Sequence, residues 1–262
     1  MDLKRTNTGQ HTPESKLFAS DPAVEACAVN ELYPRLCEIG EVGLAVEFGA
    51  APTPAVRAQV LGLLDNLNAA PFTGLLEAVA GYTTVTVYAE PLHWDAERLK
   101  TELLRRLKVA AAPQQAGGRE LVIPVCYEGE YAPDLAFVAK YTGLSPADVI
   151  ALHTGGTYPV HLIGFAPGFA YLGGLPPRLQ VPRKASPRLR VEAGSVALAG
   201  MQTGIYPFVM PGGWQVIGCT RTPLFDARAT PPGLLRPGDT VHFQAVSSET
   251  LLAGPTQGEV RG

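Results

Sequence analysis

The sequence lacks a long apolar run, which bears on where the protein resides. No stretch of about 18 apolar residues occurs in the 262-residue chain, so we expect no membrane-spanning helix. The N-terminus, MDLKRTNTGQHTPESK, is polar and has no apolar core of a signal peptide. We therefore expect a cytoplasmic protein with no membrane partner.

The chain also has little net charge and few cysteines. The 21 basic and 24 acidic residues leave a net charge of −3, too little basic charge for a nucleic-acid partner. One dense basic stretch stands out, formed by Arg178, Arg183, Lys184, Arg188 and Arg190. The four cysteines form no CxxC pair and no His/Cys set with zinc spacing, which indicates free thiols and no metal site.

Three well-known catalytic or nucleotide-binding motifs are missing. The chain has no GxGxxG after a strand, no GxxxxGK[ST] and no GxSxG. These absences exclude a dinucleotide fingerprint, a P-loop and a hydrolase nucleophile elbow. A nucleotide site, if the function needs one, cannot be located from this sequence.

The first half of the chain predicts a small α/β domain over residues 29–112, after a flexible tail at 1–28. Residues 44–48 alternate as in a strand, and Thr53-Pro54 then opens a helix with one apolar face. Two strands and a second helix from Asp95 complete a β-α-β-β-α order, typical of a split-βαβ sandwich. Residues 113–120 have the composition of a linker.

The second half predicts a β-rich domain over residues 121–250, followed by a flexible tail at 251–262. Two short helices are expected at 134–141 and 145–153, and the strands are short and separated by turns. Many short strands with Gly/Pro turns favour a closed barrel or a sandwich. The expected strands are 121–127, 158–165, 195–199, 214–219 and 240–246.

The candidate site lies between His153 and Asp239, which hold half of the 28 glycines and half of the 24 prolines. Such punctuation indicates tight turns, where binding groups tend to lie. His153 ends a helix before Thr-Gly-Gly-Thr, so its ring is a candidate for proton transfer, the alternative being a structural contact at the helix end.

Other candidates for this site are cations and polar side chains at neighbouring turns. Arg183 and Arg188 each follow a proline and are candidates for binding an anion. Gln202, Tyr206 and Trp214 supply an amide, a phenol and an indole, which suit a small polar ligand.

The segment GFAPGFAYLGG contributes a second type of candidate group. Backbone N–H groups near Gly164 and Gly168 are candidates for a carboxylate cradle. Phe165 and Phe169 flank the same Pro-Gly turn, where the alternative is simple aromatic packing. No carboxylate pair accompanies these groups, so the residues alone do not specify a reaction.

The series GFAPGFAYLGGL, PR…PR, GSVALAG, QTGIYP, PGGW and PGD closely resembles the KipI/PxpB family, also known as allophanate hydrolase subunit 1. The likeness extends from about Glu31 to Val246 and is weaker in the N-terminal half. The chain departs from the family at Cys219, where relatives usually carry arginine.

The resemblance implies an α+β protein with a ferredoxin-like N-terminal domain and a cyclophilin-like β-barrel. It implies the PxpB-type subunit of an ATP-dependent 5-oxoprolinase, which opens 5-oxo-L-proline to L-glutamate together with a KipA-type subunit and a LamB/YcsF-type subunit. In that reaction His153 and Arg183 are the candidate catalytic residues, and the ATP site is expected on, or shared with, a partner.

Three alternatives remain open at the level of sequence. The chain also resembles KipI itself, a regulator that inhibits a histidine kinase. The second is a carboxyltransferase-like component that acts on urea-derived amides, although the chain has no biotinylation site. A prolyl isomerase is the third and rests on fold analogy alone. The sequence does not decide whether copies of the chain self-associate.

Overall fold

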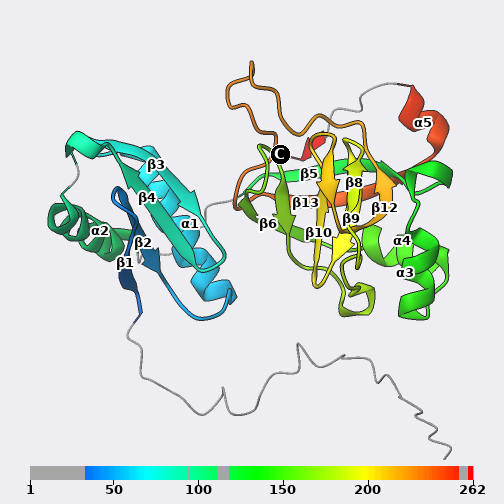
Figure 1. Ribbon diagram of the computed structural model, residues 1–262, viewed down its shortest axis with the longest axis horizontal. Coiled ribbons are helices and arrows are strands. Elements are labelled where there is room, and N and C mark those ends of the chain that lie inside the picture. The colour runs from blue at the N-terminus through cyan, green and yellow to red at the C-terminus, as the bar shows by residue number, and fades with distance from the viewer. Residues whose placement is uncertain (1–32, 94, 111–117, 254–258, 262) are drawn as a thin grey trace, which may run out of the picture. The chain divides into compact units, whose positions relative to one another are not determined.

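The computed structural model describes residues 33–93, 95–110, 118–253 and 259–261. The expected N-terminal tail at 1–28 and residues 113–117 of the expected linker lie outside the described residues. Residues 34–262 form one compact unit. Its secondary structure divides along the sequence into an α/β part and a β-barrel part (Figure 1).

The α/β part is a four-stranded antiparallel sheet with two helices. Its elements are β1 (Arg35–Ile39), β2 (Gly43–Glu47), α1 (Pro54–Ala69), β3 (Leu75–Ala80), β4 (Thr84–Ala89), the 3-10 turn η1 (Pro91–His93) and α2 (Ala96–Ala110). The strand order is β1-β2-β4-β3. The segment from β2 to α2 has the expected split-βαβ order, and β1 adds an edge strand that we did not predict.

Helix α1 begins and packs as its sequence predicts. The Thr53 hydroxyl accepts a hydrogen bond from the Val56 N–H at 3.3 Å, and Pro54 occupies the first helical position. The apolar residues of α1 recur at spacings of three and four, and the face that they form is buried against the sheet. The fully buried members of this core are Leu44, Val46, Val60, Leu63, Leu67, Val85, Val87 and Leu103.

The second part is a closed barrel of seven strands in the order β12-β9-β10-β7-β6-β13-β5, with β12 pairing back to β5. The strands are β5 (Glu120–Cys126), β6 (Tyr158–Ile163), β7 (Ala170–Leu172), β9 (Ser195–Ala199), β10 (Gln202–Ile205), β12 (Gln215–Cys219) and β13 (Thr240–Val246). The predicted α+β class with a barrel is confirmed.

Further elements surround the barrel. They are η2 (Gly129–Tyr131), α3 (Leu135–Thr142), α4 (Pro146–Thr154), η3 (Pro177–Leu179), β8 (Arg188–Val191), β11 (Met210–Gly212), α5 (Ser248–Leu252) and β14 (Glu259–Arg261). Strands β8 and β11 form a separate two-stranded ribbon. Strand β14 pairs with β5, so the expected tail at 251–262 contains a strand.

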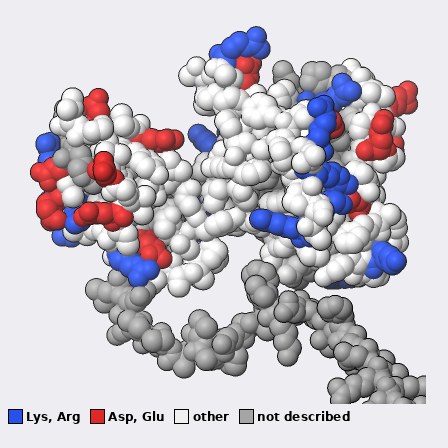
Figure 2. Space-filling view, viewed as in Figure 1, with Lys and Arg blue, Asp and Glu red and all other residues white. Residues whose placement is uncertain are grey.

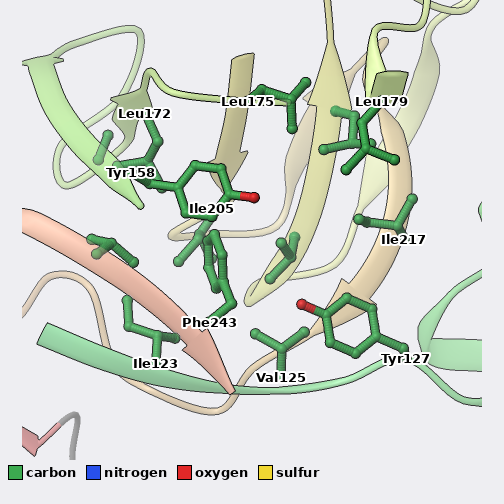
Figure 3. Close-up of a cluster of buried hydrophobic side chains, with 14 of the residues drawn as sticks. Ile123, Val125, Tyr127, Tyr158, Leu172, Leu175, Leu179, Ile205, Ile217 and Phe243 are labelled. Carbon is green, nitrogen blue, oxygen red and sulfur yellow. The ribbon is translucent and has the colours of Figure 1, made fainter. Parts of the chain in front are cut away.

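Apolar side chains fill the inside of the barrel. Figure 3 shows Ile123 and Val125 of β5 converging with Ile205 of β10, Ile217 of β12 and Phe243 of β13. Burying each such side chain stabilises the fold by roughly 1.5–3 kcal/mol. In the described ranges no single helix is long and apolar enough to cross a membrane; α3 and α4 pass that test only as a pair bent by 94°.

Candidate functional site

A pocket of about 190 Å³ lies where the turns after β6, β10 and β11 meet the segment before β8. We refer to it as the barrel pocket. It is lined by Phe165, Phe169, Tyr171, Arg183, Lys184, Pro187, Tyr206, Gly212, Gly213 and Trp214. Five of these ten were predicted from sequence as site residues, namely Phe165, Phe169, Arg183, Tyr206 and Trp214.

Phe169 forms the centre of an aromatic cluster beneath this pocket. Its ring centroid lies 5.0 Å from Tyr171, 5.5 Å from Tyr206 and 5.6 Å from Trp214, each pair edge to face. Gly204 on β10 makes room for the cluster, because a side chain there would crowd Phe169 and Trp214. The pocket walls are therefore fixed by packing, which favours a preformed site.

Tyr206 is held by a neighbouring turn. Its hydroxyl accepts a hydrogen bond from the Trp214 backbone N–H, and Gly212 lies directly against it. Burial raises the pKa of Tyr206 above its usual 10.0, although the Trp214 hydrogen bond and the Arg183 guanidinium act in the opposite direction. Tyr206 is therefore a neutral hydrogen-bonding group at physiological pH.

A single buried carboxylate orders the cations beside the pocket. Asp134 accepts two hydrogen bonds from Arg188, at 2.6 and 2.8 Å, and one from Lys184 at 2.9 Å. It also accepts the Val216 N–H at 2.8 Å. Burial alone would raise the pKa of Asp134, but these hydrogen bonds outweigh it and keep that pKa below its usual value.

Arg183 differs from its neighbours because no acidic partner is placed against it in the ranges the structure describes. Its exposed side chain lines the pocket. Figure 2 shows several Lys and Arg side chains together on the barrel, with few acidic side chains among them. Arg188, predicted to bind substrate, is instead bound to Asp134 and does not line this pocket. Arg183 is thus the cation best placed to meet an anion.

His153, the predicted proton-transfer residue, lies in the barrel core with no exposed surface. Its Nδ1 is 2.8 Å from the Tyr127 hydroxyl and its Nε2 is 3.0 Å from Thr203 Oγ1. Because Thr203 Oγ1 donates to the Ala197 carbonyl at 3.2 Å, it accepts from Nε2–H, and Tyr127 donates to Nδ1.

Both ring nitrogens of His153 are therefore occupied inside the core, and Phe243 stacks on the ring at 4.5 Å. Burial lowers the pKa of His153 to about 3, so the ring is neutral at physiological pH. These surroundings give His153 a structural role. They do not support the catalytic role predicted from its position beside Thr-Gly-Gly-Thr.

The Pro-Gly turn uses its own backbone groups. The Gly164 N–H donates to the Phe169 carbonyl at 3.0 Å, so it is not available for the predicted anion cradle. Gly168 has a φ of 78° and lies tightly against Leu224 and Phe225, where a side chain would not fit. Phe165 has a φ of 68°, and its 66% exposed ring lies at the pocket.

Gln202 is the remaining predicted residue, and it does not line the pocket. Its amide Nε2 donates to the Tyr82 hydroxyl. Sequence reasoning missed two contributors, Lys184 and Asp134. The sequence suggests only a solvated side chain at Lys184 and only a helix start at Asp134. Two Pro-Arg pairs and one acidic residue at the start of a helix give only a weak sequence signal of an ion pair.

Among the described residues, no group of three or more His, Cys, Asp or Glu side chains could hold a metal ion. A larger hollow of about 680 Å³ lies on the α/β part, next to residue 94, which is outside the described residues. Its lining includes a single aromatic ring, Phe72, in place of the cluster of rings at the barrel pocket. We therefore base the functional argument on the barrel pocket.

Comparison with known proteins places this architecture in a family. Residues 34–235 match the family model described as carboxyltransferase domain, subdomain C and D. The chain is 40% identical over 226 residues to the B-type subunit of the Bacillus subtilis 5-oxoprolinase, covering 82% of this chain and 94% of that protein. The chain belongs to the KipI/PxpB family.

Two solved structures extend the comparison. The crystal structure of TTHA0988 is 40% identical, with a TM-score of 0.70 over 79% of this chain, and the match spans only 40% of that longer chain. The urea amidolyase of K. lactis is 20% identical, with a TM-score of 0.67 over 86% of this chain and 16% of its own. At that identity the second likeness concerns the fold alone.

We predict that His153→Ala destabilises the barrel by about 2–4 kcal/mol, because it leaves a cavity and two hydroxyl groups without their partner. Urea denaturation followed by circular dichroism measures this loss. The matched control is His242→Ala, a half-buried side chain on β13 that lies 3.8 Å from Glu120, which should change stability little. A stable but inactive His153→Ala protein would restore the catalytic assignment.

We also predict that stability falls as the pH drops below about 6.5. The unfolded chain protonates histidine near 6.5, whereas burial lowers the folded-state pKa of His153 to about 3, so the unfolded state binds more protons in this window. His161, whose pKa is lowered to about 4 by burial and then by Arg57, acts in the same direction. Denaturation midpoints between pH 7 and 4 test this, and a flat profile contradicts it.

Gly212→Ala should distort the pocket, because the new Cβ would collide with the Tyr206 hydroxyl and ring. We expect a loss of roughly 1–3 kcal/mol in stability and weaker ligand binding. Gly213→Ala is the matched control, since its Cβ would meet Pro187 at an ordinary 3.5 Å. Thermal denaturation and ligand titration of both variants measure the difference, and equal behaviour of the two would refute the role of Gly212.

Proposed function

We propose that the chain is the PxpB-type subunit of an ATP-dependent 5-oxoprolinase and that its barrel pocket binds 5-oxo-L-proline. Family relatives that are B-type subunits of 5-oxoprolinase support this role at 40–46% identity. The observation that carries the proposal is the unpaired Arg183 at a small aromatic pocket. The reaction opens the lactam to L-glutamate with hydrolysis of ATP.

The size and lining of the pocket agree with this substrate. Its volume of about 190 Å³ is below the range of about 300–1,000 Å³ that drug-sized ligands use. A single five-membered ring with one carboxylate suits such a space. The guanidinium of Arg183 would bind the carboxylate with two parallel hydrogen bonds, and the rings of Phe169 and Trp214 would pack against the lactam.

A lactam carbonyl is a poor electrophile, so the ring must be activated before water attacks it. Phosphorylation of the lactam oxygen by ATP would provide this activation, and preorganised donors would stabilise the negative charge that develops. Tyr206 and Lys184 are two of the pocket residues whose side chains can donate hydrogen bonds. The pocket is too small for a nucleotide, so we place the ATP site on a partner or at a shared interface.

The proposal includes partners and a compartment. The relatives are named as subunits, which implies further components, and we expect a KipA-type and a LamB/YcsF-type partner. We expect the assembly in the cytoplasm, a compartment in which free thiols such as Cys37 are common. The chain alone should bind substrate without turning it over.

The test is release of ADP and glutamate from ATP and 5-oxoproline, with the chain alone and then with its KipA-type and LamB/YcsF-type partners. Arg183→Gln should raise the KM for 5-oxoproline at least about ten-fold, because it removes a charge-assisted hydrogen bond to the substrate. Arg178→Gln is the matched control, since Arg178 is exposed and does not line the pocket.

Two results would contradict the proposal. An unchanged KM in the Arg183→Gln complex would remove Arg183 from substrate binding. No activity in any well-folded mixture would move the function to another amide or to a regulatory role.

A further inference from the structure

The barrel closes at a pair of cysteines. Strand β12 pairs back to β5 in antiparallel fashion, and Cys219 directly opposes Cys126 in that pairing. Both residues are free thiols. This pairing, which we call the seam, is a single residue pair in the described strands.

The register of the seam is compatible with a cross-strand disulfide. Directly opposed residues of antiparallel strands have Cα atoms about 4.5–5.5 Å apart, within the range of about 4.4–6.8 Å found in disulfides. Opposed residues also place their side chains on the same face of the sheet. Val125 and Tyr127 lie in the barrel core, so Cys126 between them faces outward, away from that core.

The Cys126 thiol also influences the Cys219 thiol. Burial raises the pKa of the Cys219 thiol above its usual value, and the Cys126 thiol raises it further. Sγ of Cys219 lies 3.6 Å from the Thr220 carbonyl and 3.9 Å from the Ala193 carbonyl. These weak contacts of the thiol would be lost on formation of a bond to Cys126.

The seam is accessible from the side of Cys219. Cys219 is half-buried and lines two hollows of about 440 and 350 Å³. Cys126 has no exposed surface. A small reagent can thus reach Cys219 first. Cys126, paired opposite Cys219, is then placed to attack the mixed disulfide formed there.

We propose that Cys126 and Cys219 form a dithiol site that a low-molecular-weight disulfide oxidises to a cross-strand disulfide. The Cys219 thiolate attacks one sulfur of the reagent, forming a mixed disulfide and releasing one small thiol. The Cys126 thiolate then attacks Sγ of Cys219 and releases the second small thiol. Two electrons and two protons leave the protein, and the reagent is reduced to two thiols.

The disulfide would covalently link the strands where the barrel closes. Residues 126 and 219 enclose a long loop, and a cross-link over a long loop restricts the unfolded chain. Oxidised protein should therefore unfold at a temperature several degrees higher. Burial raises the pKa of both thiols, so oxidation should accelerate as the pH rises above neutral.

The experiment treats the full chain with oxidised glutathione at pH 7 and pH 8.5, then alkylates free thiols and maps peptides by mass spectrometry without reduction. We expect a linked peptide pair containing Cys126 and Cys219, with Cys27 and Cys37 alkylated and the protein unchanged in oligomeric state. The melting temperature should rise on oxidation and return after reduction.

Variants separate this site from general thiol reactivity. Cys219→Ser should abolish the linked peptide and the rise in melting temperature, and Cys126→Ala should leave glutathione on Cys219. Cys37→Ser, at an exposed cysteine, is the matched control and should behave as wild type. A persistent glutathione adduct on Cys219 in wild type, or alkylation of Cys126 and Cys219 as fast as Cys37, would overturn the proposal.

Discussion

The barrel pocket depends on the buried carboxylate of Asp134. Its two oxygens accept hydrogen bonds from Arg188, Lys184 and the Val216 N–H, so one side chain ties the start of α3 to β8, to β12 and to the pocket wall. Removing a partner from such a buried network leaves an uncompensated charge, which is strongly destabilising. Because Asp134 neutralises its neighbours, the pocket keeps Arg183 as its unpaired cation.

The polar groups of the barrel are divided between two environments. Inside, His153, Tyr127 and Thr203 satisfy one another in a neutral chain of hydrogen bonds. Outside the barrel wall, Tyr206 and Trp214 surround a pocket that retains unsatisfied charge. A fully satisfied network rigidifies the structure but has no group free to react. The interior therefore supports the shape of the site, and ligand binding belongs to the outer turns.

The sequence predicted much of the fold because local signals and burial agree. The Thr53 cap, the capping box at Ser145 and the left-handed Gly143 are all present, since each depends on neighbouring residues only. Short strands such as β7 and β11 escaped prediction because three residues show no periodicity. The burial of His153 escaped prediction because its position at a helix end does not reveal that the ring turns into the core. Asp134 was missed because its partners lie 50 or more residues away.

The lining of the barrel pocket offers no group suited to act as a general base. Of its ten lining residues, none is a histidine or a carboxylate, and burial raises the pKa of Tyr206 above 10.0. Lys184 is bound to Asp134, and the guanidinium of Arg183 carries hydrogen-bond donors but no acceptor. No lining group can therefore take a proton from an attacking water near neutral pH. A hydrolase that used this pocket would need its general base from elsewhere, which is why we propose that this chain binds substrate and that proton transfer belongs to the assembled complex.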